Sequence, residues 1–110
     1  MDSKTPLAAA KAIETYINAI AYGYDADSLS FADKSLVEQI KRGITDARLD
    51  IRDYEVADTR AEQLRLQQAV HARLHSLQDD ILKASQTGMF SAIEVAHISA
   101  MIEQLISNID

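Results

Sequence analysis

The chain has 110 residues, with 17 Asp or Glu against 11 Lys or Arg and a formal net charge of −6 at pH 7. It contains no cysteine and no tryptophan, so it has no disulfide framework and no thiolate metal site, and its core must be built from Leu, Ile, Val and Ala. DNA and anionic lipid are bound largely through Lys and Arg, so this charge disfavours both as partners. The length predicts a single domain over residues 1–110.

The first predicted helix covers residues 6–22. Thr5 can cap its start, and Pro6 fits the first helical position, where a missing N–H is harmless. We expect Gly23 to end this helix by adopting the left-handed conformation. One face carries the apolar residues Ala10, Ile13, Ile17 and Ile20.

The connection that follows contains Asp25 and Asp27, a spacing that resembles the start of a calcium-binding loop. The pattern then fails, because Ser30 stands where the turn needs glycine and Leu36 stands where the bidentate glutamate belongs. We interpret the segment as loop and cap chemistry. Ser30 with Asp33, or Ser35 with Glu38, forms a capping box for the next helix.

Two further helices are predicted over 34–57 and 60–86. The apolar seam of the first comprises Val37, Ile40, Ile44, Ala47, Ile51 and Tyr54, and that of the second comprises Leu66, Val70, Leu74, Leu77, Ile81 and Ala84. The stripe moves around the helix axis by about 120° between Tyr54 and Leu66, far more than the drift of a continuous helix. A capping box formed by Thr59 and Glu62 lies at this shift, so we expect a break there.

Residues 92–109 form the last predicted helix. Gly88 suits the end of the preceding helix, Ser91 with Glu94 forms a capping box, and Phe90 can pack onto Val95. Its broad apolar stripe comprises Val95, Ile98, Met101, Ile102, Leu105, Ile106 and Ile109. Short connections favour antiparallel neighbours, so the chain is predicted to be an all-α four-helix antiparallel bundle. The alternative is a three-helix bundle with helix 6–22 packed across it.

Helix 60–86 carries a second three–four seam, rotated by about 120° from the first. Its members are Leu64, Gln68, His71, His75, Gln78 and Leu82. This semi-polar pattern is typical of a contact with another helix or subunit, whereas scattered surface leucines are the ordinary alternative. We therefore predict an interface on this seam.

His71 and His75 share a helix face and are weak candidates for a metal site. Alanine follows His71, so the H-E-x-x-H arrangement lacks its glutamate, and Asp79 or Glu62 would have to complete the site after folding. A polar flank is the favoured interpretation. We expect no cofactor.

Charges are segregated on helix 34–57. Lys34, Lys41, Arg48 and Arg52 lie on one flank of its seam, and Asp46, Asp50 and Asp53 lie on the other. Ordinary solvation, the orientation of a partner helix and a nucleic-acid stripe are the three interpretations, and the last conflicts with the acidic total charge.

No nucleophile elbow, phosphate loop or dinucleotide fingerprint is present, so we expect no enzyme. The pattern favours a small cytoplasmic protein–protein interaction module, an adaptor, chaperone or regulator, that forms a homodimer through apolar helix faces. The broad stripe of helix 92–109 supports self-association, because one bundle neighbour needs only a single seam. The alternatives are a metal-binding bundle using His71 and His75, and an acidic mimic that occupies a basic surface of a nucleic-acid-binding partner. We expect no secretion signal, because Lys11 and Glu14 interrupt the early apolar stretch, and no membrane contact.

Overall fold

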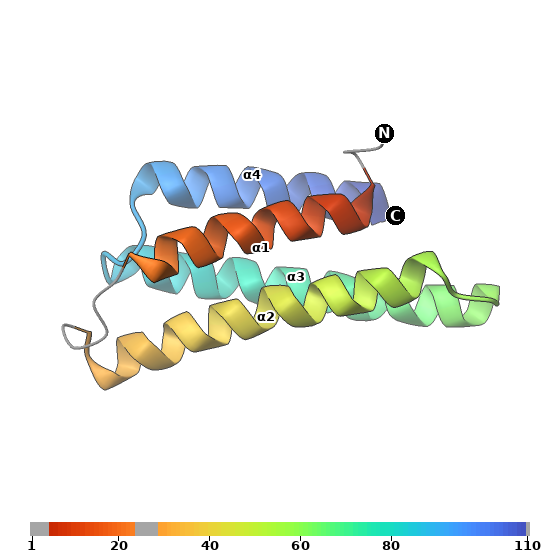
Figure 1. Ribbon diagram of the computed structural model, residues 1–110, viewed down its shortest axis with the longest axis horizontal. Helices are drawn as coiled ribbons and strands as arrows, with labels where there is room; N and C mark the ends of the chain where they lie inside the picture. The colour runs from red at the N-terminus through yellow and green to blue at the C-terminus, as the bar shows by residue number, and fades with distance from the viewer. Residues whose placement is uncertain (1–4, 24–28, 110) are drawn as a thin grey trace.

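Four helices make up the computed structural model, which describes residues 5–23 and 29–109. They are α1 (Pro6–Tyr22), α2 (Phe31–Glu55), α3 (Arg60–Gln86) and α4 (Ala92–Ile109). Successive helices run in opposite directions (Figure 1), so the predicted four-helix antiparallel bundle is confirmed. The predicted loop chemistry at Asp25 and Asp27 lies outside the described residues.

The helices form a ring in which α1 packs against α2 and α4, and α3 packs against the same two helices. Helix α1 is a full member of the bundle, so the three-helix alternative is wrong. Helices α2 and α3 have 25 and 27 residues, whereas α1 and α4 have 17 and 18. The α2–α3 hairpin therefore extends past α1 and α4 at one end (Figure 1), and the longest dimension reaches 47 Å.

The main apolar seams of α2 and α3 lie in the core. All six residues of the core seam of α3, from Leu66 to Ala84, are buried, as are the first five of the α2 seam. The sixth, Tyr54, is half-buried, and its hydroxyl donates to the carbonyl oxygen of Ile109 at 3.3 Å. The bundle thus closes around the stripes that the three–four spacing indicates.

The broad stripe of α4 is also used inside the bundle. Ile98, Ile102, Leu105 and Ile109 are fully buried, and the other three members are half-buried and packed against the core. The sequence predicts that this stripe leaves apolar surface that a second protomer would cover. Its packing against the core does not support that expectation. Only Ile93, which lies outside the stripe, is a large exposed apolar residue of α4.

The predicted limits of α1, α3 and α4 match the observed ones, because each helix has a local cap. Thr5 Oγ1 accepts the Ala8 N–H at 3.2 Å. At the start of α4 the Ser91 N–H donates to Glu94 Oε1 at 2.9 Å, while the Glu94 N–H donates to Ser91 Oγ at 3.1 Å. This reciprocal pair is a complete capping box.

The two glycines at helix ends behave differently. Gly88 has φ +83° just after α3, the conformation predicted for it. Gly23 has φ −74°, so the expectation that it ends α1 in the left-handed conformation is wrong. Its N–H instead turns back to the Ile20 carbonyl at 3.1 Å, a tightened last turn that any residue can make.

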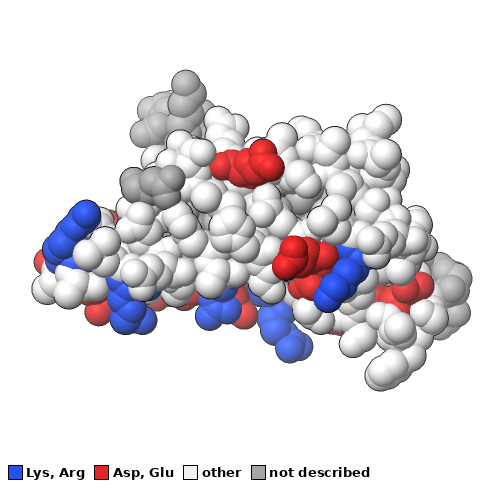
Figure 2. All heavy atoms as spheres, turned by 180° about the vertical axis from the view of Figure 1, so that it is seen from behind, with Lys and Arg blue, Asp and Glu red and all other residues white. Residues whose placement is uncertain are grey.

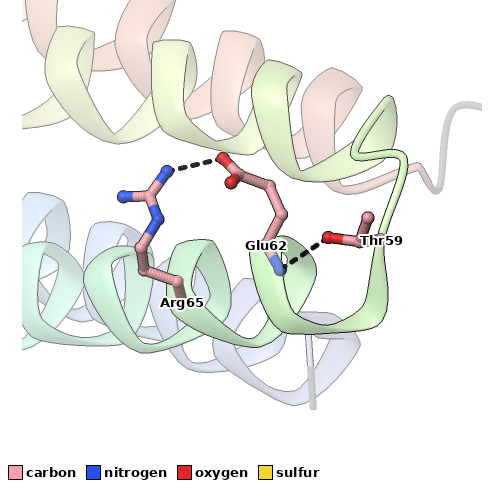
Figure 3. A network of polar contacts seen from close by, with 3 residues as sticks. All are labelled: Thr59, Glu62 and Arg65. Atoms are coloured by element: carbon pink, nitrogen blue, oxygen red, sulfur yellow. Dashed lines mark hydrogen bonds and ion pairs between the residues drawn. The ribbon is translucent and has the colours of Figure 1, made fainter.

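The predicted break between α2 and α3 is present, but its capping box is only half formed. Thr59 Oγ1 accepts the Glu62 N–H at 3.1 Å, as expected. The Glu62 carboxylate does not return to the Thr59 backbone, because it accepts from Arg65 Nη2 at 2.6 Å (Figure 3). One polar contact thus starts α3, and the second stabilises its first turn.

Helix α2 spans 31–55 rather than 34–57. It begins earlier because Ser30 provides the cap, accepting the Asp33 N–H at 3.1 Å. Phe31 is exposed and falls outside the apolar seam, so periodicity places the start too late. The helix stops at Glu55 because Val56 leaves the helical region at φ −111° and its N–H turns back to Asp53.

Candidate functional site

The second predicted seam of α3, from Leu64 to Leu82, lies on the outside of the bundle, and we call it the α3 seam. Leu64 and Leu82, at its two ends, are exposed, as are Gln68 and His75. His71 and Gln78 are half-buried. The seam is therefore accessible along its length, and an interface on it stays a prediction.

Within residues 5–23 and 29–109, no third metal ligand lies with the histidine pair. Among the described residues, no group of three or more His, Cys, Asp or Glu side chains is placed to hold a metal ion. Glu62, one of the two expected supplements, is engaged by Arg65. The remaining histidine, His97 on α4, packs against Tyr16 of α1 with ring centroids 4.7 Å apart.

The charged flanks of α2 contact the neighbouring helices of the same chain. On the α1 side, Arg48 Nε lies 2.7 Å from Glu14 Oε1, and Thr45 Oγ1 donates to Glu14 Oε2 at 2.7 Å. On the α3 side, Arg73 pairs with Asp50 and lies 3.5 Å from Asp46. The charged flanks of α2 thus contact helices of the same chain, which is the kind of contact predicted for a partner helix. Arg48 is paired with Glu14, so it is not part of a free basic stripe.

Sequence reasoning missed a buried carboxylate between α2 and α3. Asp80 is 5% exposed, and the Gln39 side-chain amide donates to its Oδ1 and Oδ2 at 3.2 and 3.0 Å. Lys83 Nζ lies 3.9 Å from Asp80 Oδ1. A cleft of about 200 Å³ borders this pair, lined by the two residues with Arg42, Gly43, Asp46, Arg73, Ser76 and Leu77. Asp80 joins the two long helices and is already satisfied by its neighbours.

Charge is distributed unevenly between the two halves of the ring. Helices α1 and α4 carry two Asp, Glu, Lys or Arg residues each, against eleven in α2 and seven in α3. Seen from behind in Figure 2, blue and red side chains interleave over the α2–α3 half, while the upper part is almost white. No extended acidic face appears in this view, which an acidic mimic would need.

Large apolar side chains are exposed at one end of the bundle, where α1 and α3 end and α2 and α4 begin. Tyr22 is 93% exposed, Phe31 88% and Ile93 80%, and Leu82 lies exposed one turn before the end of α3. These residues come from four different helices. Only two other large apolar residues of the described chain, Val56 and Leu64, are exposed, and both lie toward the opposite end. We call the first group the apolar end.

A groove of about 520 Å³ opens between α1 and α2 at the apolar end. Its apolar lining includes Ala21, Tyr22, Leu29 and Val37. Lys34 and Lys41 stand two helical turns apart along its α2 side. Lys41 lies 3.7 Å from Glu38, whereas Lys34 forms no ion pair with any described residue.

The opposite end, the tip of the α2–α3 hairpin, carries the reverse pattern. A hollow of about 390 Å³ is lined by Asp53, Val56, Ala57, Asp58, Thr59 and Glu62. Val56 is 71% exposed. Asp53 is close to Arg52, and Glu62 is close to Arg65, but Asp58 has no ion-pair partner within 5–23 or 29–109. The hairpin tip therefore presents an apolar side chain with carboxylates around it.

No protein-family model, curated protein or solved structure matches this chain. None of the described helices is long and apolar enough to cross a membrane. The surfaces of the bundle therefore carry the evidence for its function.

Proposed function

We propose that this chain is a cytoplasmic, non-catalytic protein-interaction module that docks other proteins at its apolar end. The observation that supports this is the exposure of Tyr22, Phe31 and Ile93 at one end of the bundle, where Tyr22 also lines a groove with a largely apolar lining. Exposed apolar side chains that gather in one region of a soluble domain mark interaction surfaces, and aromatic residues are enriched in interface cores.

The closed core strengthens this interpretation. Twelve large side chains, contributed by all four helices, are fully buried. The bundle therefore has no packing use for three large apolar residues that remain almost entirely in water. A structural explanation of these residues would require them to be covered within the fold, and they are not.

Affinity capture from the native lysate tests the proposal. The tagged wild type is compared with a Tyr22→Ser/Phe31→Ser/Ile93→Ser variant, and bound proteins are quantified by mass spectrometry. We expect a partner that is retained by the wild type and lost by the triple variant, with no change in helicity. The control is Leu64→Ser, which removes an exposed leucine toward the other end.

Two outcomes would contradict the proposal. Equal capture by the triple variant would remove the apolar end from partner binding. Loss of the partner with Leu64→Ser alone would instead place the docking surface on the α3 seam.

A further inference from the structure

The two ends of the molecule carry complementary charges, with lysines beside the groove at one end and carboxylates at the hairpin tip. One end has a groove with an apolar lining and two lysines on its side, and the other has a projecting tip with an exposed valine and carboxylates. We propose that the hairpin tip of one copy binds the groove of a second copy, so that the protein associates head to tail. This inference rests on the proposed function and names a second copy as the occupant of the groove.

The charges of the groove and the tip favour this contact between copies. The whole chain is acidic, yet the groove is lined by two lysines and one glutamate. Lys34 at the groove and Asp58 at the tip are both exposed, and neither has an ion-pair partner in the described chain. Bringing them together joins two charges that are unpaired among residues 5–23 and 29–109 of one copy, and complementary charges of this kind set the register of an interface.

Burial of the exposed Val56 side chain in the groove also favours this contact. Val56 is the only large apolar side chain exposed on the hairpin tip within the described residues. The groove offers Ala21, Leu29 and Val37 as apolar neighbours, with Tyr22 at its wall. Insertion of Val56 removes apolar surface from water on both copies, which favours association.

The positions of the groove and the tip suit a head-to-tail contact. The hairpin extends past α1 and α4, so the tip reaches a neighbouring molecule before the rest of that end does (Figure 1). The groove and the tip lie at opposite ends of the α2–α3 hairpin, so each bound copy leaves one groove and one tip free. Such a heterologous contact generates open chains or closed rings rather than a dimer that stops at two copies.

Sedimentation velocity over a range of protein concentrations tests this inference. The wild type is expected to grow beyond a dimer as concentration rises, and added salt is expected to reverse the growth because the charges are exposed. Lys34→Glu and Asp58→Lys are each expected to weaken association by about tenfold or more, because an attractive pair becomes a repulsive one.

Charge reversal provides the decisive comparison. An equimolar mixture of the two single variants, and the Lys34→Glu/Asp58→Lys double variant alone, are both expected to recover association. Lys11→Glu and Asp79→Lys are matched controls, because they make the same charge changes at exposed positions that line neither the groove nor the hairpin tip, and they are expected to behave as wild type.

Three outcomes would overturn the inference. They are a wild type that stays monomeric at millimolar concentration, a mass that stops at a dimer, and control variants that dissociate like the test variants. These outcomes do not affect the proposed function. A monomeric protein that still loses a lysate partner with the triple variant would leave the apolar end as a docking surface for a different protein. The opposite result is a protein that assembles head to tail while the triple variant captures lysate proteins as well as the wild type does. That result would support head-to-tail association and contradict the proposed function.

Discussion

The amide of Gln39 donates to both carboxylate oxygens of Asp80, and this contact joins residues 41 positions apart across the two longest helices. Asp80 is buried, so its carboxylate depends on protein donors for solvation. Removing the donor is therefore more harmful than removing both partners together.

A double-mutant cycle measures this dependence. Gln39→Ala is expected to lower the free energy of unfolding by about 1.5–3 kcal/mol, the range for a hydrogen bond to a charged group. With Asp80→Ala also present, no buried charge remains to be satisfied, so the two effects are expected to couple by about 0.5–3 kcal/mol. Urea denaturation of the four proteins gives the coupling, and additive effects would contradict it.

The core assignment is tested at Leu74, which is completely buried in the middle of α3. Leu74→Ala is expected to lower the free energy of unfolding by about 2–5 kcal/mol, through lost burial and the cavity left behind. Leu64→Ala on the same helix is the control, because its exposed side chain predicts a change within about 0.5 kcal/mol. Similar losses in the two variants would show that the core seam of α3, from Leu66 to Ala84, is misassigned.

Two glycines are expected to respond to alanine with opposite signs. Gly43 lies inside α2, where an added Cβ would be 3.6 Å from Leu77 Cδ1, an ordinary contact. Gly43→Ala is expected to raise the free energy of unfolding by about 0.5–1 kcal/mol, because glycine is a poor helix former. Gly88→Ala is expected to lower it by about 1–2 kcal/mol, because φ +83° is unfavourable for a residue with a Cβ. Thermal unfolding of both variants tests this contrast, and two changes of the same sign would refute it.

The α3 seam makes a separate prediction about self-association. Leu64 and Leu82 are exposed, so replacing both with Glu is expected to leave helicity unchanged while breaking a dimer formed through this seam. Light scattering gives the mass, and Ala61→Glu/Ala72→Glu is the control at exposed α3 positions outside the seam. An unchanged mass would make the seam ordinary surface. A seam dimer stops at two copies, so it is distinguishable from head-to-tail association.

Most of the fold is predictable because its determinants are local. Thr5, Thr59 and the Ser91–Glu94 pair fix helix starts through contacts within three residues, and the seams follow from helical spacing. The start of α2 is missed because Ser30 and Ser35 both precede plausible partners, and only the folded chain shows that Ser30 is the cap.

The surfaces are less predictable because they depend on pairs that are distant in sequence. Asp80 lies outside the apolar seams of α3, and only the folded chain shows that it is buried and bonded to Gln39. Arg48 and Lys34 look equivalent along α2, but only Arg48 faces an acidic residue of α1. The groove combines α1 with α2, and the apolar end combines four helices, so neither has a pattern within one helix.

The start of α1 depends on a residue at the far end of α2. The Leu7 N–H donates to Glu55 Oε2 at 3.1 Å, although 48 residues separate them. A carboxylate at a helix N-terminus stabilises it through the exposed amides and the helix dipole. An isolated peptide of α1 would keep the Thr5 cap but lack this hydrogen bond, so docking onto the hairpin adds stability to the first turn. Fraying of the last turn of α2 would remove this hydrogen bond and weaken the first turn of α1, so these two distant segments are coupled.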